Sequence, residues 1–530
     1  FWLVPSYRCD EEFRKIDKFM EFLEKSGVGK IVESVKTKDK QCKGRKGRKG
    51  YNPYNLFAMI IYCFAKFKAS LRDIEDKCIF DLRVLHIMEG NIPDHSVIGD
   101  FINEYIIPYQ YEIFTTITKQ IIKDFNLTIE DIFVDGTKLE ANADKYKFVW
   151  KPTKYHTRLD IKIKELLKEM GYVPNSNKLI KAEELNKLLK DYASINQIEI
   201  PIPTSRGKRL SKEQKNYKLA YQYLTKLLEY EEKERICGKN RNSYYKTDKD
   251  ATAMVLKKDY YSKLSHDFHA GYNVQVLVSN LLILMYGVFQ DRTDYYTFIP
   301  MNNLYFKYYQ RHPKNICADS GYGIYINYKY LREHHIGNYV KFQTWSGEAS
   351  GKSPQLFYTF NDGVMCLDTC IGKEIPFNQN YHQRNKEGKL FKFIGCNNCK
   401  YAYKCKAKLK HKDYDYRTVE LIPDYELLKE EARNNLQSPK GIEMRINRSI
   451  QAEGTFGQIK NNMNYDRIRR RGLENVSVEI MLMCLGVNLR KYFLSLDDNK
   501  FKNNYWKIPT ILHKEIFPSV KPKEKRLSRN

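Results

Sequence analysis

The chain has 530 residues, which is too long for one compact core and predicts two to four domains. It contains no run of about 18 or more apolar residues, which excludes a membrane-spanning helix of the usual length, and residues 1–30 lack a signal-peptide pattern. With 91 Lys and Arg against 64 Asp and Glu, the net charge of +27 predicts a polyanionic partner, with nucleic acid ahead of an anionic membrane surface. The 12 cysteines are too dilute for a disulfide scaffold, so we expect a reducing cytosol.

The N-terminal part of the chain is predicted to be helical. Residues 10–35 carry apolar side chains at helical spacing, and residues 53–120 follow a helical pattern in which Asp94 looks like a cap. Between them, residues 36–50 form a basic, glycine-rich stretch, for which a solvated linker and a phosphate contact are both open. Its candidate DNA contacts are Arg45, Lys46, Arg48 and Lys49. A helical module beside this linker is consistent with DNA docking or with dimerisation. Helical periodicity does not tell which of these two roles the module has.

A strand that ends on an acidic residue stands out at 131–142 (DIFVDGTKLEAN). The apolar run 132–134 is typical of a buried strand, and Asp135 follows it. Asp135 and Gly136 by themselves favour a hairpin turn, because Asp-Gly is a strong turn dipeptide. A strand-like pattern resumes at 138–141, however, and no hairpin partner lies nearby. Asp135 is therefore a candidate metal ligand, and such a site would need other carboxylates close to it in the folded chain.

Residues 150–245 are rich in lysine and follow a helical pattern with leucines at the apolar positions. Pro201, Pro203 and Gly207 break this pattern into two parts, which predicts an inserted helical hairpin or arm. DNA contact and a solvated helix pair without a functional role are equally open for this insertion.

The clearest hairpin pattern lies at 271–291, because two β-rich runs flank Ser279 and Asn280. We therefore expect two strands to follow the Asp135 strand in the same sheet. A helix from about 295 to 309 should come next.

The stretch 315–322 (NICADSGY) repeats the first motif, because a short apolar strand again ends on an aspartate, Asp319. An Asx-type turn explains one such aspartate by itself. Two strand-end aspartates, Asp135 and Asp319, in one α/β region favour a metal site.

Residues 344–440 look polar and irregular, and they hold a C-x2-C-x5-C array. The array consists of Cys396, Cys399 and Cys405. Tetrahedral zinc needs four ligands, and Cys366 or Cys370 would complete a set of four thiolates. Structural zinc and free surface thiols are both open for these residues.

The last informative stretch runs from 445 to 493. Its helical apolar stripe consists of Ile446, Ile450, Phe456 and Ile459. Glu453 and Lys460 share a neighbouring face, so this helix can bring a third carboxylate and a phosphate contact, although most helix glutamates are merely solvated. A basic cluster follows, made of Arg467, Arg469, Arg470 and Arg471. The apolar helix at 480–489 is expected to pack on the sheet.

Together, these motifs resemble the DDE transposases of bacterial insertion sequences, most closely the eleven-eighty-two group. The segments that carry the resemblance are VDGTKLEANADKYKFVW, PDHSVIGDF, DKDATAM, GYNVQ, GVFQDRTD, ADSGY, CNNCKYAYKC and NRSIQAEGTFGQIK, within roughly residues 50–493. The resemblance implies an α/β fold with a ribonuclease H-like catalytic core, a mixed sheet flanked by helices. It also implies that the family's catalytic aspartates match Asp135 and Asp319, and that its glutamate matches Glu453.

The implied domains surround this core in sequence. They are an all-helical N-terminal DNA-binding or dimerisation domain at 1–120, the catalytic core at 121–343 and 441–495, a helical insertion at 150–245 within the core, a cysteine-bearing insertion at 344–440 and a basic tail at 496–530.

One position departs from the sibling families. They place an arginine four residues before the catalytic glutamate, where this chain has Ser449. Arg448 is the nearest equivalent, but at about 100° per residue it is expected to lie off the Glu453 face of an α-helix. Lys460, seven residues after the glutamate, fits the sibling pattern of a phosphate contact.

The resemblance also implies the chemistry and the partners. Two Mg²⁺ or Mn²⁺ ions about 4 Å apart would assist phosphodiester cleavage and strand transfer, with Asp135 bridging both ions and Asp319 and Glu453 holding one each. The expected partners are double-stranded DNA, as the terminal inverted repeats of the element and as target, and further copies of the chain in a homodimer or larger complex. No Walker A pattern is present, so we expect no ATP. The expected location is the bacterial cytosol, in association with the nucleoid.

Two other functions stay open. The chain could be a DNA-binding protein derived from a transposase, acting in repression or as a scaffold without catalysis. It could also be a metal-dependent nuclease that hydrolyses DNA and joins nothing.

Overall fold

The computed structural model describes most of the chain. The described residues are 6–39, 50–67, 70–175, 177–200, 210–239, 241–256, 268–350, 357–360, 363–366, 370–378, 381–400, 402–404, 413–463 and 465–496. Several predicted features lie outside them, namely Arg45, Lys46, Arg48 and Lys49 of the linker, Cys405, and all but the first residue of the tail 496–530.

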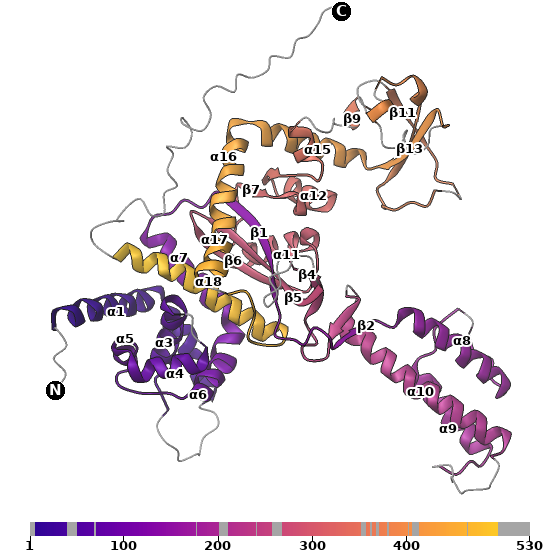
Figure 1. Cartoon of the computed structure of the whole chain (residues 1–530), viewed down its shortest axis with the longest axis horizontal. Coiled ribbons are helices and arrows are strands. Elements are labelled where there is room, and N and C mark those ends of the chain that lie inside the picture. Colours follow the sequence, from indigo (N-terminus) through magenta and orange to yellow (C-terminus); the bar gives the residue numbers. More distant parts are fainter. Residues whose placement is uncertain are drawn as a thin grey trace, which may run out of the picture.

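The N-terminal part is helical, as predicted (Figure 1). Its helices are α1 (Ser6–Ser26), α2 (Val28–Asp39), α3 (Pro53–Lys66), α4 (Leu71–Phe80), α5 (Leu82–Ile87), α6 (His95–Phe101), η1 (Ile102–Ile106), η2 (Ile107–Tyr109) and α7 (Gln110–Asp124). Residues 10–35 were expected to form one helix, but Gly27, with φ +78°, separates α1 from α2. The predicted cap is confirmed, because the Asp94 carboxylate accepts hydrogen bonds from the backbone amides of Ser96 and Val97.

A mixed sheet forms the centre of the molecule. Its strands are β1 (Asp131–Glu140), β4 (Thr252–Val255), β5 (Phe268–Ser279), β6 (Leu282–Phe289), β7 (Asn315–Ala318) and β8 (Gly337–Val340). The order is β4-β5-β1-β7-β8, with β6 also paired to β5. β1 is antiparallel to β5 and parallel to β7. The predicted hairpin around Ser279 and Asn280 is confirmed as β5 and β6, and both strands belong to the sheet of Asp135.

The Asp-Gly dipeptide lies inside a strand and forms no turn. β1 continues through it, with Asp135 opposite Val276 and Gly136 opposite Gln275 on β5. A Cβ at Gly136 would lie 2.1 Å from Nε2 of Gln275. This position therefore requires glycine because a neighbouring side chain occupies the space, and not because of a turn conformation.

Helices cover the sheet and join it to the N-terminal part. They are η3 (Asp294–Tyr296), α11 (Phe298–Tyr309), η4 (Ser320–Tyr322), α12 (Tyr325–Glu333), α13 (Trp345–Ala349), α15 (Pro423–Gln437), α16 (Pro439–Arg448), η7 (Ser449–Glu453), α17 (Gly454–Gly457), η8 (Gln458–Asn462) and α18 (Leu473–Leu496). α18 packs on β6, α3 and α7, as predicted for its apolar run. One continuous cluster of buried apolar side chains therefore includes the sheet and helices α1 to α7.

A helical arm leaves the core between β2 (Phe148–Trp150) and β3 (Ser243–Tyr245), which pair with each other (Figure 1). It consists of α8 (Thr153–Glu169), α9 (Ala182–Ile195) and α10 (Lys212–Cys237). We expected two helical parts, but a further break after α8, with Gly171 at φ +88°, gives three helices. The arm has its own apolar cluster, separate from the main core.

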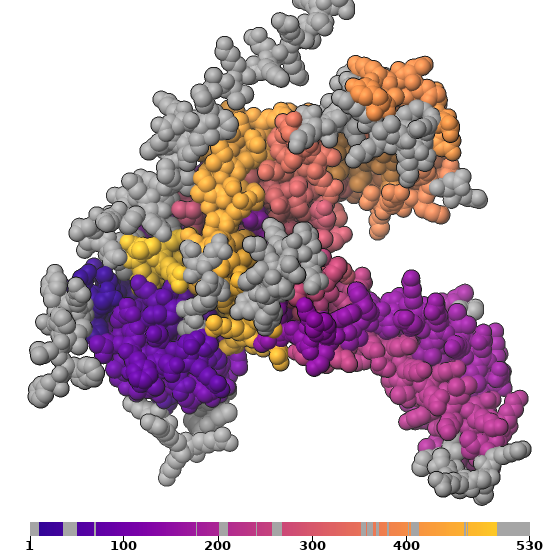
Figure 2. All heavy atoms as spheres, viewed as in Figure 1, coloured from indigo at the N-terminus to yellow at the C-terminus, as the bar shows by residue number. Residues whose placement is uncertain are grey.

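The cysteine-bearing region is more regular than its sequence suggested. It forms an antiparallel sheet in the order β13-β12-β11-β10-β9. Its elements are β9 (Phe357–Phe360), β10 (Gly363–Cys366), β11 (Cys370–Ile375), β12 (Lys389–Ile394), η5 (Cys396–Asn398), η6 (Ala402–Lys404) and β13 (Tyr416–Leu421). Phe391 and Phe393 are two residues apart in β12 and share one face of the sheet, which builds a small core with Val364. The arm and this second sheet extend from the core as separate lobes (Figure 2).

No helix in the described part of the chain is both long and apolar enough to cross a membrane.

Candidate active site

Strand register places Asp135 and Asp319 side by side. β1 and β7 are parallel neighbours, with Ile132 opposite Ile316 and Phe133 opposite Cys317. Continued by two residues, this register brings Asp135 level with Asp319, which immediately follows β7. Adjacent strands are about 4.8 Å apart, so the two aspartates belong to one site. The prediction that the two aspartates belong to one α/β region is confirmed, but Asp135 lies within β1 and not at its end.

Asp319 also makes the turn that its sequence suggested. Its Oδ1 accepts a hydrogen bond of 2.8 Å from the backbone amide of Gly321 and so caps η4. The Asx turn and the neighbouring position to Asp135 are therefore compatible, because the turn uses one carboxylate oxygen and leaves the other for further contacts.

Glu453 lies on a helix whose turns are not uniformly α-helical. α16, η7, α17 and η8 follow one another without a break, and η7 and η8 are π-helical. A π turn brings residues five apart onto the same side, whereas an α turn does so for residues three or four apart. The wider turns also change which residues face the core. Ile450, expected in the apolar stripe, is exposed, whereas Phe456 and Ile459 are buried.

Arg448 links two of the three carboxylates. Its Nη2 lies 2.6 Å from Oε1 of Glu453, and its Nη1 lies 3.6 Å from Oδ1 of Asp135. Ser449, at the position of the sibling arginine, donates its hydroxyl to the other oxygen of Glu453 at 2.9 Å. The expectation that Arg448 lies off the Glu453 face was wrong, because it assumed α-helical geometry where the chain makes a π turn.

The surroundings of Asp135 disfavour its negative charge. Its side chain is 15% exposed, against 52% for Glu453. Burial raises the pKa of Asp135 to about 6, the guanidinium of Arg448 opposes this rise, and the charge of Asp319 adds to it. Burial therefore outweighs the stabilising effect of Arg448 on the ionised form of Asp135.

The donor chemistry of the site fits a hard divalent cation, because carboxylate oxygens are the ligands that Mg²⁺ and Mn²⁺ prefer. A divalent cation beside Asp135 would favour its ionised form, against the burial that raises its pKa. In the residues that the structure describes, however, no three His, Cys, Asp or Glu side chains are gathered in a metal-binding group. Arg448 lies among these carboxylates instead.

The predicted basic residues lie around the same strand. Nζ of Lys460 approaches the backbone oxygen of Lys138 on β1 at 3.4 Å. Arg467 pairs with Glu140 at the end of that strand, at 3.7 Å, and Arg469 and Arg471 are exposed. The arginine loop, residues 467–471, is thus next to the end of β1.

The backbone of the arginine loop is held at several points. Glu479, buried on α18, accepts hydrogen bonds from the amides of Arg469 and Arg470. Arg471 donates through Nε to the backbone oxygen of Asn142, whose side chain donates to the backbone oxygen of Arg469. These bonds hold the main chain at Arg469 and Arg470 and tie the guanidinium of Arg471 to Asn142 through its Nε, while Arg469 and Arg471 stay exposed.

The cysteines are arranged in part as predicted. Cys366 and Cys370 lie opposite each other in the β10–β11 hairpin. Burial raises the pKa of the Cys370 thiol, and the neighbouring Cys399 adds to the rise. Cys396 lies in the turn after β12, close enough to Cys399 for both to contribute to one site. Cys405, the third cysteine of the predicted array, lies outside the described residues.

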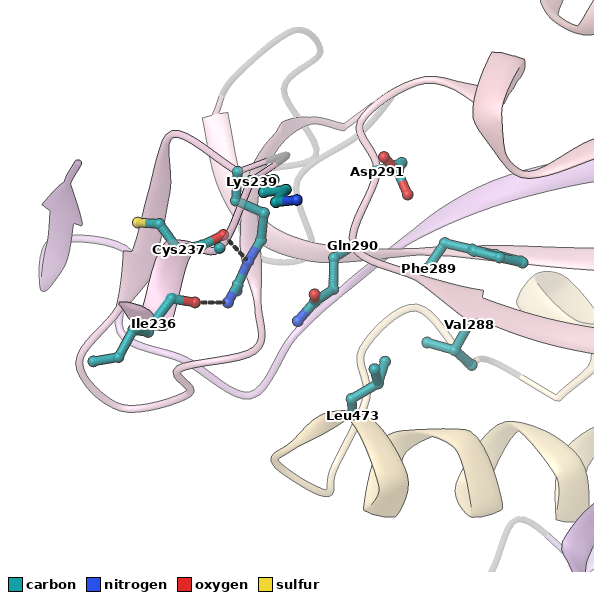
Figure 3. A pocket seen from close by; sticks show the side chains of 10 residues that line it. Ile236, Cys237, Lys239, Val288, Phe289, Gln290, Asp291 and Leu473 are labelled. Atoms are coloured by element: carbon teal, nitrogen blue, oxygen red, sulfur yellow. Dashed lines mark hydrogen bonds between the residues drawn. The ribbon is translucent and has the colours of Figure 1, made fainter. Parts of the chain in front are cut away.

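A pocket lies at the root of the arm (Figure 3). It is lined by the end of α10, including Ile236 and Cys237, by Gln290 and Asp291 after β6, and by Leu473 at the start of α18. None of the three carboxylates lines it. Arg241, another lining residue, donates to the backbone oxygens of Ile236 and Cys237, so its charge serves to close the end of α10.

Sequence reasoning missed the polar residues that support the site. The segments GYNVQ, GVFQDRTD and DKDATAM contributed to the resemblance without any role being assigned to them. Asp248 and Asp250 accept hydrogen bonds from the amides of Gly472 and Leu473, which begin α18. Both aspartates lie just before β4 in the segment DKDATAM, where two closely spaced acidic residues were the available signal.

Comparison with known proteins gives one match. Residues 371–493 match the family model described as "Transposase DDE domain". No curated protein and no solved structure matches the chain. The matched segment contains Glu453, the helix that carries it and the arginine loop. This segment of the chain is therefore similar to the DDE domain of a transposase.

Proposed function

We propose that the protein is a DNA transposase that cuts DNA at the ends of an insertion sequence and joins those ends to target DNA. The observation that supports this best is the register of β1 and β7, which makes Asp135 and Asp319 neighbours. Glu453 is connected to them through the guanidinium of Arg448. A ribonuclease H-like arrangement of the core agrees with the order of the central strands.

Asp135, Asp319 and Glu453 are the residues that would hold two Mg²⁺ or Mn²⁺ ions. Such a pair stabilises the charge on the attacking and leaving oxygens of a phosphodiester. Asp135 would bind in its ionised form, and Arg448 has to give up its contact with Glu453 or share it. Arg448 and Lys460 then lie within the same helix for contacts with DNA phosphates.

DNA is the proposed partner, as the inverted repeats at the ends of the element and as target. The net charge of +27 supports non-specific affinity for a polyanion. The exposed Arg469 and Arg471 of the arginine loop are the best-placed described contacts, because their backbone is fixed before DNA arrives. A homodimer or larger complex on paired ends, and location with the nucleoid in a bacterial cytosol, belong to the same proposal.

Structural zinc in the second sheet is a separate part of the proposal. Cys396 and Cys399 would supply two thiolates, and Cys366 or Cys370 a third from the adjacent hairpin. Cys370 is close enough to Cys399 for the charge of one to affect the other, and this proximity favours Cys370 in that role.

The experiment that tests the function uses DNA that carries both flanks of the gene. The full-length protein is incubated with it and Mg²⁺ or Mn²⁺, and all nicks and joints are mapped by sequencing. We expect metal-dependent cuts at a repeated end sequence together with joined products. Cuts without joints would point to a nuclease, and tight binding without cuts would point to a DNA-binding protein derived from a transposase.

A further inference from the structure

A buried polar network lies beside Asp319. Asn273 and Gln275 on β5 are fully buried, and their side-chain amides both donate to Oδ1 of Asp294, each at 2.8 Å. Gln275 also donates to Oδ1 of Asn273 at 2.8 Å. The hydroxyl of Tyr322 donates to Oε1 of Gln275 at 2.5 Å. These hydrogen bonds all lead toward one carboxylate, that of Asp294.

The network lies beside Asp319 and beside Gly136, the residue that follows Asp135. A Cβ added at Gly321 would meet Oδ1 of Asp319 at 3.0 Å and Oδ2 of Asp294 at 3.3 Å, so the two carboxylates lie against the same glycine. On the other side, Gln275 fills the space above Gly136, the residue that follows Asp135. The network thus lies between Gly136, which follows Asp135, and Gly321, which lies two residues after Asp319.

The carboxylate of Asp294 determines which groups of the network donate hydrogen bonds and which accept them. The amide of Gln275 points its nitrogen at Asp294, which leaves its oxygen for the hydroxyl of Tyr322. Tyr322 is fully buried, and its backbone oxygen accepts a hydrogen bond from Asn327. Replacing buried polar groups by apolar ones is often neutral for stability, so stability alone does not explain an aspartate at this place.

We propose that Asp294 is a positioning residue for the site. Its carboxylate orients Gln275 and Tyr322, and through them it fixes the turn of Asp319 relative to the strand of Asp135. This inference rests on the proposed function. Partners that hold a metal ligand in place typically change metal affinity or activity about 10- to 100-fold when they are lost.

The variant that tests the role is Asp294→Asn, which keeps the shape and an acceptor for Asn273 and Gln275 but removes the charge. Asp291→Asn is the matched control, because Asp291 lies in the same segment and lines the pocket at the root of the arm. Mn²⁺ binding to the full-length protein is measured by titration calorimetry without DNA. Cleavage rates are measured on the flanking DNA over a range of Mn²⁺ concentrations.

We expect Asp294→Asn to weaken Mn²⁺ binding about tenfold or more, with a cleavage rate that recovers as Mn²⁺ is raised. Tyr322→Phe removes one hydrogen bond of the network and should also weaken Mn²⁺ binding, with a smaller effect. If Asp294→Asn does not fold, the result for Tyr322→Phe tests the inference by itself. Asp291→Asn should behave as wild type. Wild-type Mn²⁺ binding and cleavage in both network variants would overturn the inference alone. A wild-type protein that binds no Mn²⁺ and cuts nothing would overturn the proposed function and this inference with it.

Discussion

Arg448 and Glu453 are five residues apart and form an ion pair of 2.6 Å across a π turn. The same guanidinium lies 3.6 Å from Asp135. A single protein cation therefore balances two carboxylates that the proposed function assigns to metal ions. Metal and guanidinium should compete for these oxygens.

Arg448→Gln should therefore raise the affinity for Mn²⁺. Glu453 is half-exposed, so the lost pair is worth on the order of 1 kcal/mol, and we expect a gain of about three- to tenfold. Titration calorimetry without DNA measures it. Arg445→Gln is the control, since Arg445 lies on the same helix and stacks on Trp345. An unchanged or weaker affinity in Arg448→Gln would show that Arg448 does not compete with the metal.

The raised pKa of Asp135 predicts how stability depends on pH. The folded protein holds this proton more tightly than the unfolded chain, so Asp135 favours folding at low pH and this contribution is lost as pH rises through about 6. Asp135→Asn removes the charge. We expect it to be more stable than wild type at pH 7.5, by on the order of 2 kcal/mol, and the gain to shrink at pH 5. Thermal unfolding of both proteins without metal, at pH 5 and pH 7.5, measures this gain in stability. A gain that does not depend on pH would contradict the raised pKa of Asp135.

Gly136→Ala should disrupt the site through Gln275. The added Cβ would lie 2.1 Å from Nε2 of Gln275, and overpacking of this kind typically costs about 1–3 kcal/mol. Thermal unfolding should show the loss. Gly454→Ala is the control, because no atom lies within 4 Å of its added Cβ. The double variant Gly136→Ala/Gln275→Ala should recover part of the stability, and a double variant no more stable than Gly136→Ala would show that Gln275 is not the obstacle.

The arm should be removable without unfolding the core. Its apolar cluster is separate from the main one, and the paired strands β2 and β3 close its base. Replacing residues 153–239 by a short turn should leave the melting temperature of the core nearly unchanged. We expect weaker binding to DNA in a salt-dependent binding assay, because the arm is rich in lysine. A truncated protein that does not fold would show that the arm contributes to the main core.

Local sequence patterns predicted the two aspartates because each follows a short apolar run, and the register of two parallel strands brings them level, although β1 continues past Asp135. The approach of Arg448 to Glu453 could not be predicted in this way. Helical periodicity assumes one fixed angle per residue, whereas η7 and η8 use wider turns. The same wider turns explain why Ile450 is exposed although it fits the apolar pattern.

The supporting network was also hidden from pattern reasoning. Asn273 and Gln275 read as the polar face of a strand, which normally faces solvent, but β5 lies between β1 and β6 and is buried on both faces. Their partner Asp294 is close in space and follows a different strand in the chain. Only the tertiary arrangement brings these residues together.

The central claim is that Asp135, Asp319 and Glu453 form one metal-dependent site. The most direct measurement is cleavage of the flanking DNA by Asp135→Asn, Asp319→Asn and Glu453→Gln, each with Mn²⁺ and each checked for folding and DNA binding. Glu443→Gln on the same helix and Asp291→Asn serve as controls. The account predicts that the three variants bind DNA but do not cut it, and that both controls cut as wild type does. Cleavage at the wild-type rate by any of the three would contradict it.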